Sequence, residues 1–359
     1  MSHLFSPLTL RGTRIPNRIV VSPMCQYSAP DGVVGDWHLV HLGSRAVGGA
    51  GVVTVEATGV EPRGRITPYD VGLWNDEQAD ALARVARFVR EQGSVPAIQL
   101  AHAGRKASTD RTWKGGGPVS LEEGGWEAVA PSADPWPHEE GPVPTRELST
   151  GEIGDVVDAF ADSAARAREA GFEILEVHAA HGYLIHEFLS PVTNAREDEY
   201  GGSFENRTRL IREVTAAIRA EWPDDRPLFV RISATDWLDD RDSWDLAQSV
   251  RLAPLVADAG ADLIDVSAGG ITPDSHPEQA GPGYQVPFAE TIRRETDVPV
   301  ATVGGLTDPK HADAVIRNGR ADLAVLGRQH LRDPYFALHA AEELGVDVDW
   351  PVQYHRAEP

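Results

Sequence analysis

The stretch Phe172-Glu173-Ile174-Leu175-Glu176-Val177 is an apolar run that ends at His178-Ala179-Ala180-His181-Gly182-Tyr183. Side chains alternate between the two faces of a strand, so two histidines three residues apart on one strand would point in opposite directions. They can act together if His178 is the last residue of the strand and the chain bends directly after it. His181 and Tyr183 then lie on the following loop. Two imidazoles and a phenol gathered there can hydrogen-bond one oxygen atom and supply one proton, which predicts an active site at the strand's carboxyl end.

Seven other apolar runs, rich in β-branched residues, accompany this strand, and most are separated by segments with helical periodicity. The eight runs are Ile19–Ser22, Val52–Glu56, Pro96–Leu100, Ile174–His178, Leu228–Ile232, Leu263–Val266, Val300–Val303 and Leu323–Leu326. The helical segments are Leu39–Val47, Glu77–Glu91, Ile153–Ala170, Glu205–Glu221, Leu246–Ala259, Phe288–Glu295, Lys310–Asn318 and Pro334–Glu343. Near-continuous apolar strands are typical of parallel sheets covered by helices. The pattern predicts the α/β class and a single (β/α)8 TIM barrel spanning residues 1–359.

A doubly wound open sheet is the alternative architecture. No G-x-G-x-x-G follows the first run, where Asp31-Gly32 and the loop to Trp37 stand instead, so a dinucleotide-binding start is not supported. Two connections are long, 101–148 after the third strand and 179–203 after the fourth. Because loops that follow strands lie on the catalytic face of a barrel, we expect both to serve the site. Ser149-Thr150-Gly151-Glu152 has the pattern of a capping box and predicts the start of the third helix.

Composition narrows the classes of function. The net charge of -22 argues against nucleic acid as a partner. The apolar runs are too short to span a membrane and the N-terminal residues lack a signal-peptide pattern, so we expect a soluble cytoplasmic protein. The single cysteine, Cys25, excludes a disulfide framework within one chain. Only Lys106, Lys114 and Lys310 among the 33 basic residues are lysines, which suits either a high-salt habitat or a GC-rich genome.

Polar and glycine-containing motifs follow most of the predicted strands. They are Ser22-Pro23-Met24-Cys25-Gln26-Tyr27, Glu56-Ala57-Thr58, Gln99, Arg231, Val303-Gly304-Gly305 and Leu326-Gly327-Arg328. Paired glycines after the last two strands of a barrel commonly bind a phosphate group through backbone N–H groups, and Arg328 would add charge-assisted hydrogen bonds. Glycine also serves tight turns, so at this point both a phosphate site and plain turns are open.

Several longer motifs carry a family resemblance. Ser22–Tyr27, Gln99-Leu100-Ala101-His102-Ala103-Gly104-Arg105-Lys106, His178–Leu184, His186-Glu187-Phe188-Leu189-Ser190-Pro191, Glu199-Tyr200-Gly201-Gly202-Ser203 and Asn206-Arg207 resemble the old yellow enzyme family. Cys25 and the closing Gln353-Tyr354-His355-Arg356 resemble its thermophilic-like NADPH dehydrogenase branch. The likeness runs in order from about Leu4 to Arg356.

This resemblance implies a tightly bound, non-covalent FMN, reduced by NADPH or NADH. The implied flavin contacts are Ser22, Pro23, Met24, Cys25, Ala57, Gln99, Arg231, Gly304, Gly305, Gly327 and Arg328. For two of these residues, Arg231 and Cys25, an alternative role is open. The charge of Arg231 would be compensated by an anionic reduced flavin at N1, or by a structural salt bridge with a buried acid. Cys25 would either contact the flavin edge or be a small buried hydrophobe, and we do not expect it to be a nucleophile.

The resemblance also implies an ene-reductase that acts on small electrophilic alkenes. Hydride would pass from flavin N5 to the β-carbon of an α,β-unsaturated carbonyl compound while His178 and His181 donate to its oxygen. Tyr183 would protonate the α-carbon, and Tyr27 would contact the substrate. The alternatives are a zinc site at the two histidines, loop packing for Tyr27, and a proton taken from solvent; we expect no metal. His102, His186, Trp37, Arg105 and Lys106 are interpreted as supporting or packing residues.

The C-terminal tail, about 346–359, is expected at a subunit interface. The branch implies a homodimer or homotetramer in which Arg356 reaches a neighbouring active site and binds substrate. The last residues, Ala357-Glu358-Pro359, depart from that branch's ending, and the alternative is a solvated terminus. Two other functions remain open: an FMN barrel with an iron–sulfur cluster, which a single cysteine disfavours, and a barrel that binds a phosphorylated ligand without redox chemistry.

Overall fold

Eight parallel strands form a closed barrel in the order β10-β11-β12-β3-β4-β5-β8-β9, which confirms the predicted TIM barrel. The computed structural model describes residues 2–358. The sheet closes where β12 pairs with β3 in the register Val325↔Val20. The barrel strands are β3 (Ile19–Val21), β4 (Val52–Gly59), β5 (Val95–Ala101), β8 (Ile174–Ala179), β9 (Leu228–Ser233), β10 (Leu263–Ser267), β11 (Val300–Val303) and β12 (Leu323–Leu326).

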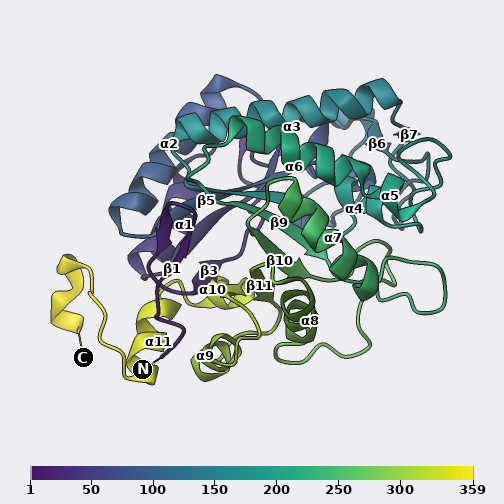
Figure 1. Cartoon of the computed structure of the whole chain (residues 1–359). Helices are drawn as coiled ribbons and strands as arrows, with labels where there is room; N and C mark the ends of the chain where they lie inside the picture. Colours follow the sequence, from purple (N-terminus) through teal and green to yellow (C-terminus); the bar gives the residue numbers. More distant parts are fainter. Residues whose placement is uncertain (1, 359) are drawn as a thin grey trace.

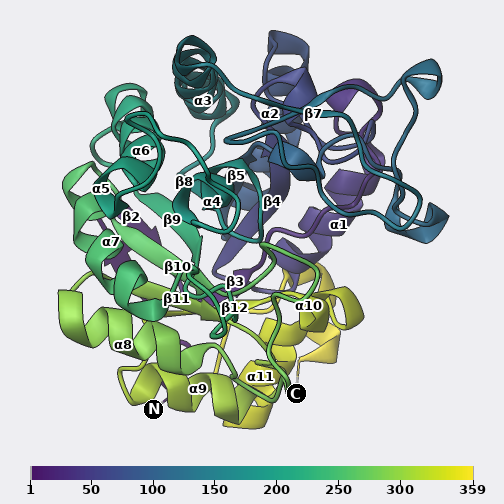
Figure 2. The same ribbon diagram turned by 90° about the vertical axis from the view of Figure 1, so that its right-hand side faces the viewer.

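Helices surround these strands on the outside of the barrel (Figure 2). The main ones are α1 (Asp36–Val47), α2 (Asp76–Glu91), α3 (Thr150–Ala170), α6 (Arg209–Glu221), α7 (Leu246–Asp258), α8 (Val286–Thr296), α9 (Pro309–Arg317) and α11 (Phe336–Leu344). The predicted helix 205–221 is divided at Thr208, which leaves α5 (Phe204–Arg207) as a separate short turn before α6. The order of strands and helices is therefore the one that the apolar periodicity predicts.

The start and end of α3 follow from its flanking residues. The Ser149 hydroxyl accepts from the backbone N–H of Glu152 at 3.3 Å, and the Glu152 carboxylate accepts from the backbone N–H of Ser149 at 3.0 Å. These two bonds satisfy N–H groups that the first turn leaves free, so the predicted capping box is confirmed. Gly171 ends the helix with a left-handed φ of 90°.

Several elements were not predicted. β1 (Leu8–Leu10) and β2 (Thr13–Ile15) form an antiparallel hairpin before the first barrel strand. In the long connections, β6 (Ala128–Ala130) pairs with β7 (Thr145–Glu147), and a short helix, α4 (Leu184–Leu189), occupies part of the segment expected to be a loop. α10 (Arg328–Arg332) begins directly after β12. The strand β8 ends at Ala179, one residue beyond the expected His178.

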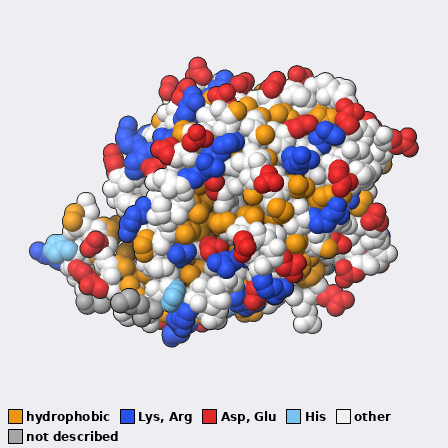
Figure 3. All heavy atoms as spheres, viewed as in Figure 1, with side chains coloured by type: hydrophobic (Ala, Val, Ile, Leu, Met, Phe, Trp, Pro, Cys, Tyr) orange, Lys and Arg blue, Asp and Glu red, His pale blue; other side chains and the backbone are white. Residues whose placement is uncertain are grey.

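The remaining features of the fold are the C-terminal segment and the charge of the surface. The C-terminal segment, which carries the 3-10 helix η6 (Val352–Ala357), projects from the body of the molecule (Figure 1). No helix among residues 2–358 is long and apolar enough to cross a membrane. Acidic side chains are spread among basic ones over the face drawn in Figure 3, so the charge of -22 is distributed and does not form one acidic patch there.

Close packing between α1 and the segment before α11 gives a test of the fold. A Cβ added at Gly48 would lie 2.2 Å from the carbonyl oxygen of Pro334, so we expect Gly48→Ala to lower the free energy of unfolding by about 1–3 kcal/mol. Gly154→Ala on α3, where a Cβ meets nothing within 4 Å, should change it little or raise it by up to about 1 kcal/mol. Urea unfolding followed by tryptophan fluorescence measures the free energy of unfolding of both variants. An unchanged value for Gly48→Ala would contradict the close packing at Gly48.

Candidate active site

His178, His181 and Tyr183 lie together at the barrel mouth. The ring centroids of His178 and His181 are 5.1 Å apart, and those of His178 and Tyr183 are 4.9 Å apart, each pair in an edge-to-face arrangement. His178 is the penultimate residue of β8, and Tyr183 caps the start of α4. The bend between them puts His181 in the left-handed region at φ 60°. Two imidazoles and a phenol therefore converge as the sequence predicts.

The left-handed turn at His181 and Gly182 is held by contacts from β9 and from the segment that follows β5. The backbone N–H of His181 donates to the Ser233 hydroxyl at 3.0 Å, and the buried ammonium of Lys106 donates to the His181 carbonyl oxygen at 2.7 Å. A Cβ at Gly182 would lie 2.1 Å from the Gly270 carbonyl oxygen, so this position requires glycine. Because His181 is not a glycine, its left-handed backbone conformation costs free energy. The hydrogen bonds with Ser233 and Lys106 offset this cost.

Burial sets the charge of the three groups. It lowers the pKa of His178 and of His181 well below the ordinary value, and the charge of Arg231 adds to the effect. Burial also raises the pKa of the Tyr183 phenol, with a further contribution from Cys25. Both imidazoles are therefore neutral and the phenol is protonated near pH 7, so each ring offers one N–H and the phenol one O–H.

Hydrogen bonds restrict which nitrogen of each ring is free. The backbone N–H of Ala180 donates to Nδ1 of His178 at 3.3 Å, which places the ring proton of the neutral imidazole on Nε2. Nε2 of His181 lies 2.7 Å from the Ser267 hydroxyl. Ser267 is a site residue that the sequence analysis missed; its position directly after the sixth apolar run was the available signal.

The residues interpreted as supporting bind neighbouring segments. His186 Nε2 lies 2.9 Å from the buried carboxylate of Asp236, and Nδ1 accepts from the Gly182 N–H at 2.9 Å. His102 Nε2 lies 2.9 Å from Glu61, and Arg105 pairs with Asp134. Lys106 has its ammonium 4.1 Å from the centroid of the Trp136 ring and 5.5 Å from that of Tyr183. Burial lowers the pKa of Lys106 to about 7.

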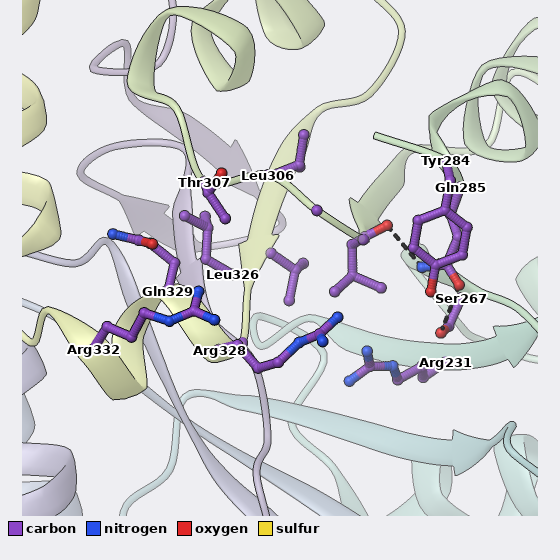
Figure 4. Close-up of a pocket in the computed structure, with 15 residues that line it drawn as sticks. Arg231, Ser267, Tyr284, Gln285, Leu306, Thr307, Leu326, Arg328, Gln329 and Arg332 are labelled. Atoms are coloured by element: carbon purple, nitrogen blue, oxygen red, sulfur yellow. Dashed lines mark hydrogen bonds between the residues drawn. The ribbon is translucent and has the colours of Figure 1, made fainter. Parts of the chain in front are cut away.

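A cavity of about 340 Å³ opens beside the histidines at the carboxyl ends of the last strands. Five of the predicted flavin contacts line it: Gly304, Gly305, Gly327, Arg328 and Arg231. Figure 4 shows Arg328 extending across it toward Arg231. Residues that the sequence analysis did not single out also line it: Ser267, Tyr284, Gln285, Thr307, Gln329 and Arg332. Neither Arg328 nor Arg332 has an ion-pair partner within residues 2–358.

The predicted residues that follow β3 approach the glycine turn of the same cavity, whereas Ala57 of β4 and Gln99 of β5 are not among the residues that line it. A Cβ at Gly327 would lie 3.7 Å from the Met24 sulfur and 3.8 Å from Ser22 Cβ, so the segment of Ser22, Pro23 and Met24 borders the glycine turn. Arg231 donates from Nη1 to the Ser22 hydroxyl at 3.2 Å. Ala57 and Gln99 are register partners on β4 and β5.

The surroundings of Arg231 and Cys25 bear on the roles expected for these two residues. Nε of Arg231 lies 3.4 Å from the Asp265 carboxylate, so the guanidinium has a buried acid as counter-ion even while it lines the cavity. Burial raises the pKa of the Cys25 thiol well above its ordinary value, with Asp70 and Glu56 adding to the effect. The thiol is therefore protonated near pH 7.

The remaining predicted residues lie at the rim or away from it. Tyr27 packs against Trp113 with ring centroids 5.9 Å apart, so it has a loop partner. Arg356 is exposed on the projecting η6 segment and is not brought to the histidines of its own chain. Within residues 2–358, no group of three or more His, Cys, Asp or Glu side chains is arranged to hold a metal ion.

The lining of the cavity fits FMN. Two unpaired guanidinium groups in a chain of net charge -22 suit a phosphate dianion. Glycines with left-handed φ, 116° at Gly304 and 68° at Gly305, leave the backbone open to such a group because no side chain covers it. Arg231 adds a further polar group to this lining. The arginines and the uncovered glycine backbone of this lining fit the phosphate of such a cofactor.

Comparison with known proteins identifies the chain. Residues 3–346 match the model of the NADH:flavin oxidoreductase / NADH oxidase family. The chain belongs to this family. It is 48% identical over 98% of both chains to an NADPH dehydrogenase of Geobacillus thermodenitrificans (strain NG80-2), and 46% identical over 98% of both to one of Bacillus subtilis (strain 168). It is a flavin-linked oxidoreductase, which removes the alternative of a barrel without redox chemistry.

Solved structures agree with the assignment. The old yellow enzyme homologue from Zymomonas mobilis superposes with a TM-score of 0.79 at 27% identity, covering 99% of both chains. Morphinone reductase superposes with a TM-score of 0.79 at 28% identity, covering 97% of this chain and 91% of that one. The resemblance to the old yellow enzyme family is therefore confirmed.

Proposed function

We propose that this protein is an FMN-dependent ene-reductase that uses NADPH or NADH to reduce activated C=C bonds. The observation that carries the proposal is the convergence of His178, His181 and Tyr183 beside a cationic cavity at the barrel mouth. The 48% identity to an NADPH dehydrogenase, over 98% of both chains, supports NADPH as the reductant. The single cysteine and the absence of a metal-binding group within residues 2–358 disfavour a related barrel with an iron–sulfur cluster.

Residues at the strand ends would hold the cofactor tightly without a covalent bond. Arg328 and the N–H groups around Gly304, Gly305 and Gly327 would bind its phosphate, while Gln99 and Arg231 would bind the polar edge of its ring. Ser22, Pro23, Met24, Cys25 and Ala57 would line one side of the ring. When bound, FMN supplies the hydride, taken from NAD(P)H and delivered from N5 to the β-carbon of the alkene.

The two histidines would bind the carbonyl oxygen of the alkene substrate. His178 can donate from Nε2, because Nδ1 already accepts from Ala180. The 2.7 Å contact of His181 Nε2 with Ser267 is shorter than the 3.4 Å contact of Ser267 with Gln285, so we assign the hydroxyl proton of Ser267 to His181. His181 then donates from Nδ1. Donors aimed at an oxygen that gains negative charge lower the barrier because the bonds strengthen in the transition state.

Tyr183 would donate its phenolic proton to the α-carbon. Its raised pKa keeps the proton in place until that carbon has become strongly basic, so protonation follows hydride arrival. Tyr27 would contact the substrate from the opposite loop.

We also propose that Arg356 contacts substrate in a neighbouring subunit of a homodimer or homotetramer. The tail projects from its own barrel, with Val352 exposed to 77% and Tyr354 to 40%. Helices α1 and α10, joined by a bond from Arg45 to His330, expose Trp37, Val40 and Leu331. A second copy would cover these apolar groups. The absence of a spanning helix within residues 2–358 and the need for NAD(P)H support a cytoplasmic location.

Absorbance spectroscopy tests the proposed function directly. The purified protein should show flavin absorbance, bleach on anaerobic addition of NADPH, and regain its colour when an enone or maleimide is added. Mass spectrometry of the alkene product should show the gain of two hydrogens. A colourless protein that does not bind added FMN would refute the proposal, and so would a reduced protein that no alkene reoxidises.

The histidines should be required for alkene reduction and for ligand binding at the oxygen site. We expect His178→Ala or His181→Ala to slow alkene reduction about 10²–10³-fold, as loss of one oxyanion donor does, and to weaken phenol binding measured by flavin absorbance. FMN content should stay near stoichiometric. His276→Ala, at an exposed loop position, is the control. Alkene turnover that survives either site substitution would contradict the oxygen-binding role.

Tyr183→Phe should separate the two half-reactions. We expect alkene-dependent reoxidation to slow about 10²–10⁴-fold, because a general acid is lost, while reduction by NADPH keeps its rate. Stopped-flow measurement of both steps on one preparation makes the reductive step an internal control. Equal slowing of both steps would argue against proton donation by Tyr183.

A further inference from the structure

Three charged side chains lie inside the barrel on consecutive strands: Glu176 of β8, Arg231 of β9 and Asp265 of β10, all buried. Asp265 is the register partner of Arg231 and its counter-ion. Glu176 and Asp265 line the same small space inside the barrel. Gln99 of β5 donates from Nε2 to Oε1 of Glu176 at 2.7 Å. The four side chains form one connected network beneath the site.

The network is electrically neutral only if one of its two carboxyl groups is protonated. Two carboxylates and one guanidinium would leave an uncompensated negative charge in the barrel, which costs several kcal/mol. The space beside the two carboxyl groups is about 10 Å³, lined otherwise by residues such as Thr54, Ile174 and Phe229. A space of that size holds at most about one water molecule, so a hydrated counter-ion does not fit.

The remaining strands bring no second counter-ion into this space. On β4, Glu56 accepts from the backbone N–H of Gln26 and faces His38 instead. β3, β11 and β12 contribute Val20, Ala301, Leu323 and Val325 to its lining. His178, two residues beyond Glu176 on the same face of β8, is kept neutral by burial, which lowers its pKa. A shared proton is the remaining way to balance the charge.

Hydrogen bonding assigns that proton. Oδ1 of Asp265 is buried and accepts from no N–H or O–H group elsewhere in residues 2–358, so it requires a donor from its neighbour. Asp265 lies against Arg231 and is therefore the carboxyl group better stabilised as an anion. We propose that Glu176 is a neutral carboxylic acid that donates to the Asp265 carboxylate and, by accepting from Gln99, acts as a positioning residue for the cofactor site.

The proposal gives Gln99 a defined orientation. With one hydrogen of Nε2 engaged by Glu176, Gln99 presents its other N–H beside its carbonyl oxygen. A donor next to an acceptor matches the C=O and N–H edge of a pyrimidine ring. This consequence rests on the proposed FMN site, whereas the assignment of the proton does not. Burial raises the pKa of Glu176 to about 8, in agreement with a protonated group at neutral pH.

Infrared spectroscopy of the FMN-free protein tests the assignment. The spectrum of wild type minus that of Glu176→Gln at pH 6 should contain the C=O band of one protonated carboxyl group, and other buried acids cancel in the difference. Labelling glutamate carboxyls with carbon-13 should shift this band, and labelling aspartate should not. A band that shifts only with aspartate labelling would place the proton on Asp265, and the absence of any band would mean two carboxylates; either result overturns the proposal.

The pH dependence of stability provides a second measurement. A folded pKa near 8, above the ordinary value of about 4.3, means that the folded state holds a proton that the unfolded state has lost. The wild type therefore loses stability as pH rises from 5 to 8, and Glu176→Gln escapes this loss. The thermal midpoint of the variant should rise relative to wild type across that range. Glu342→Gln, at an exposed position on α11, should show a constant difference; a constant difference for Glu176→Gln would overturn the proposal.

FMN affinity tests the positioning role. Glutamine retains both hydrogen bonds of the neutral acid, so Glu176→Gln should bind FMN within about threefold of wild type. Glu176→Leu loses both bonds and should bind about tenfold more weakly, corresponding to about 1.4 kcal/mol. Equal affinities in Glu176→Leu and wild type, or equal weakening in both variants, would refute the role. If no variant and no wild-type protein bound FMN, the proposed function would fail while the infrared result stood.

Discussion

Pairing between β12 and β3 closes the sheet, and every feature of the site depends on that closure. Because all eight strands are parallel, their carboxyl ends meet at one mouth. Side chains far apart in the sequence then lie within a few ångströms of each other. One example is the hydrogen bond from Arg231 to Ser22, which are 209 residues apart. The glycine turns after β11 and β12 reach the same cavity as Arg231 of β9. An open sheet would spread these groups along an edge.

Burial and charge act together at this mouth. The same desolvation that keeps His178 and His181 neutral also keeps the Tyr183 phenol protonated. Arg231 contributes to the first effect, since its charge opposes a second positive charge on either ring. Arg328 and Arg332 make the adjoining cavity cationic, although the chain as a whole carries a charge of -22. Neutral donors thus lie beside a region that suits an anion.

The sequence predicted the barrel well because its signals are local. Each strand is an apolar run and each main helix has its own periodicity, so order and approximate bounds could be predicted without knowing any contact. The hairpin β1–β2 and the helix α4 were missed because three and six residues are too few for a period to emerge. The convergence of His178, His181 and Tyr183 was predictable from one bend. The contacts of Ser267 and Lys106 were not, since they join segments distant in sequence.

The charged network inside the barrel could not be predicted from local sequence patterns. Glu176, Arg231 and Asp265 each interrupt an apolar run, yet only the arginine was singled out, because a single run does not reveal which strand lies beside it. One layer lower, Ile174, Phe229 and Leu263 fill the same barrel with apolar groups. Well-packed apolar residues generally serve stability as well as a buried ion pair does. A polar layer is therefore not required by the barrel itself, and its place directly beneath the mouth connects it to the groups that the mouth must orient.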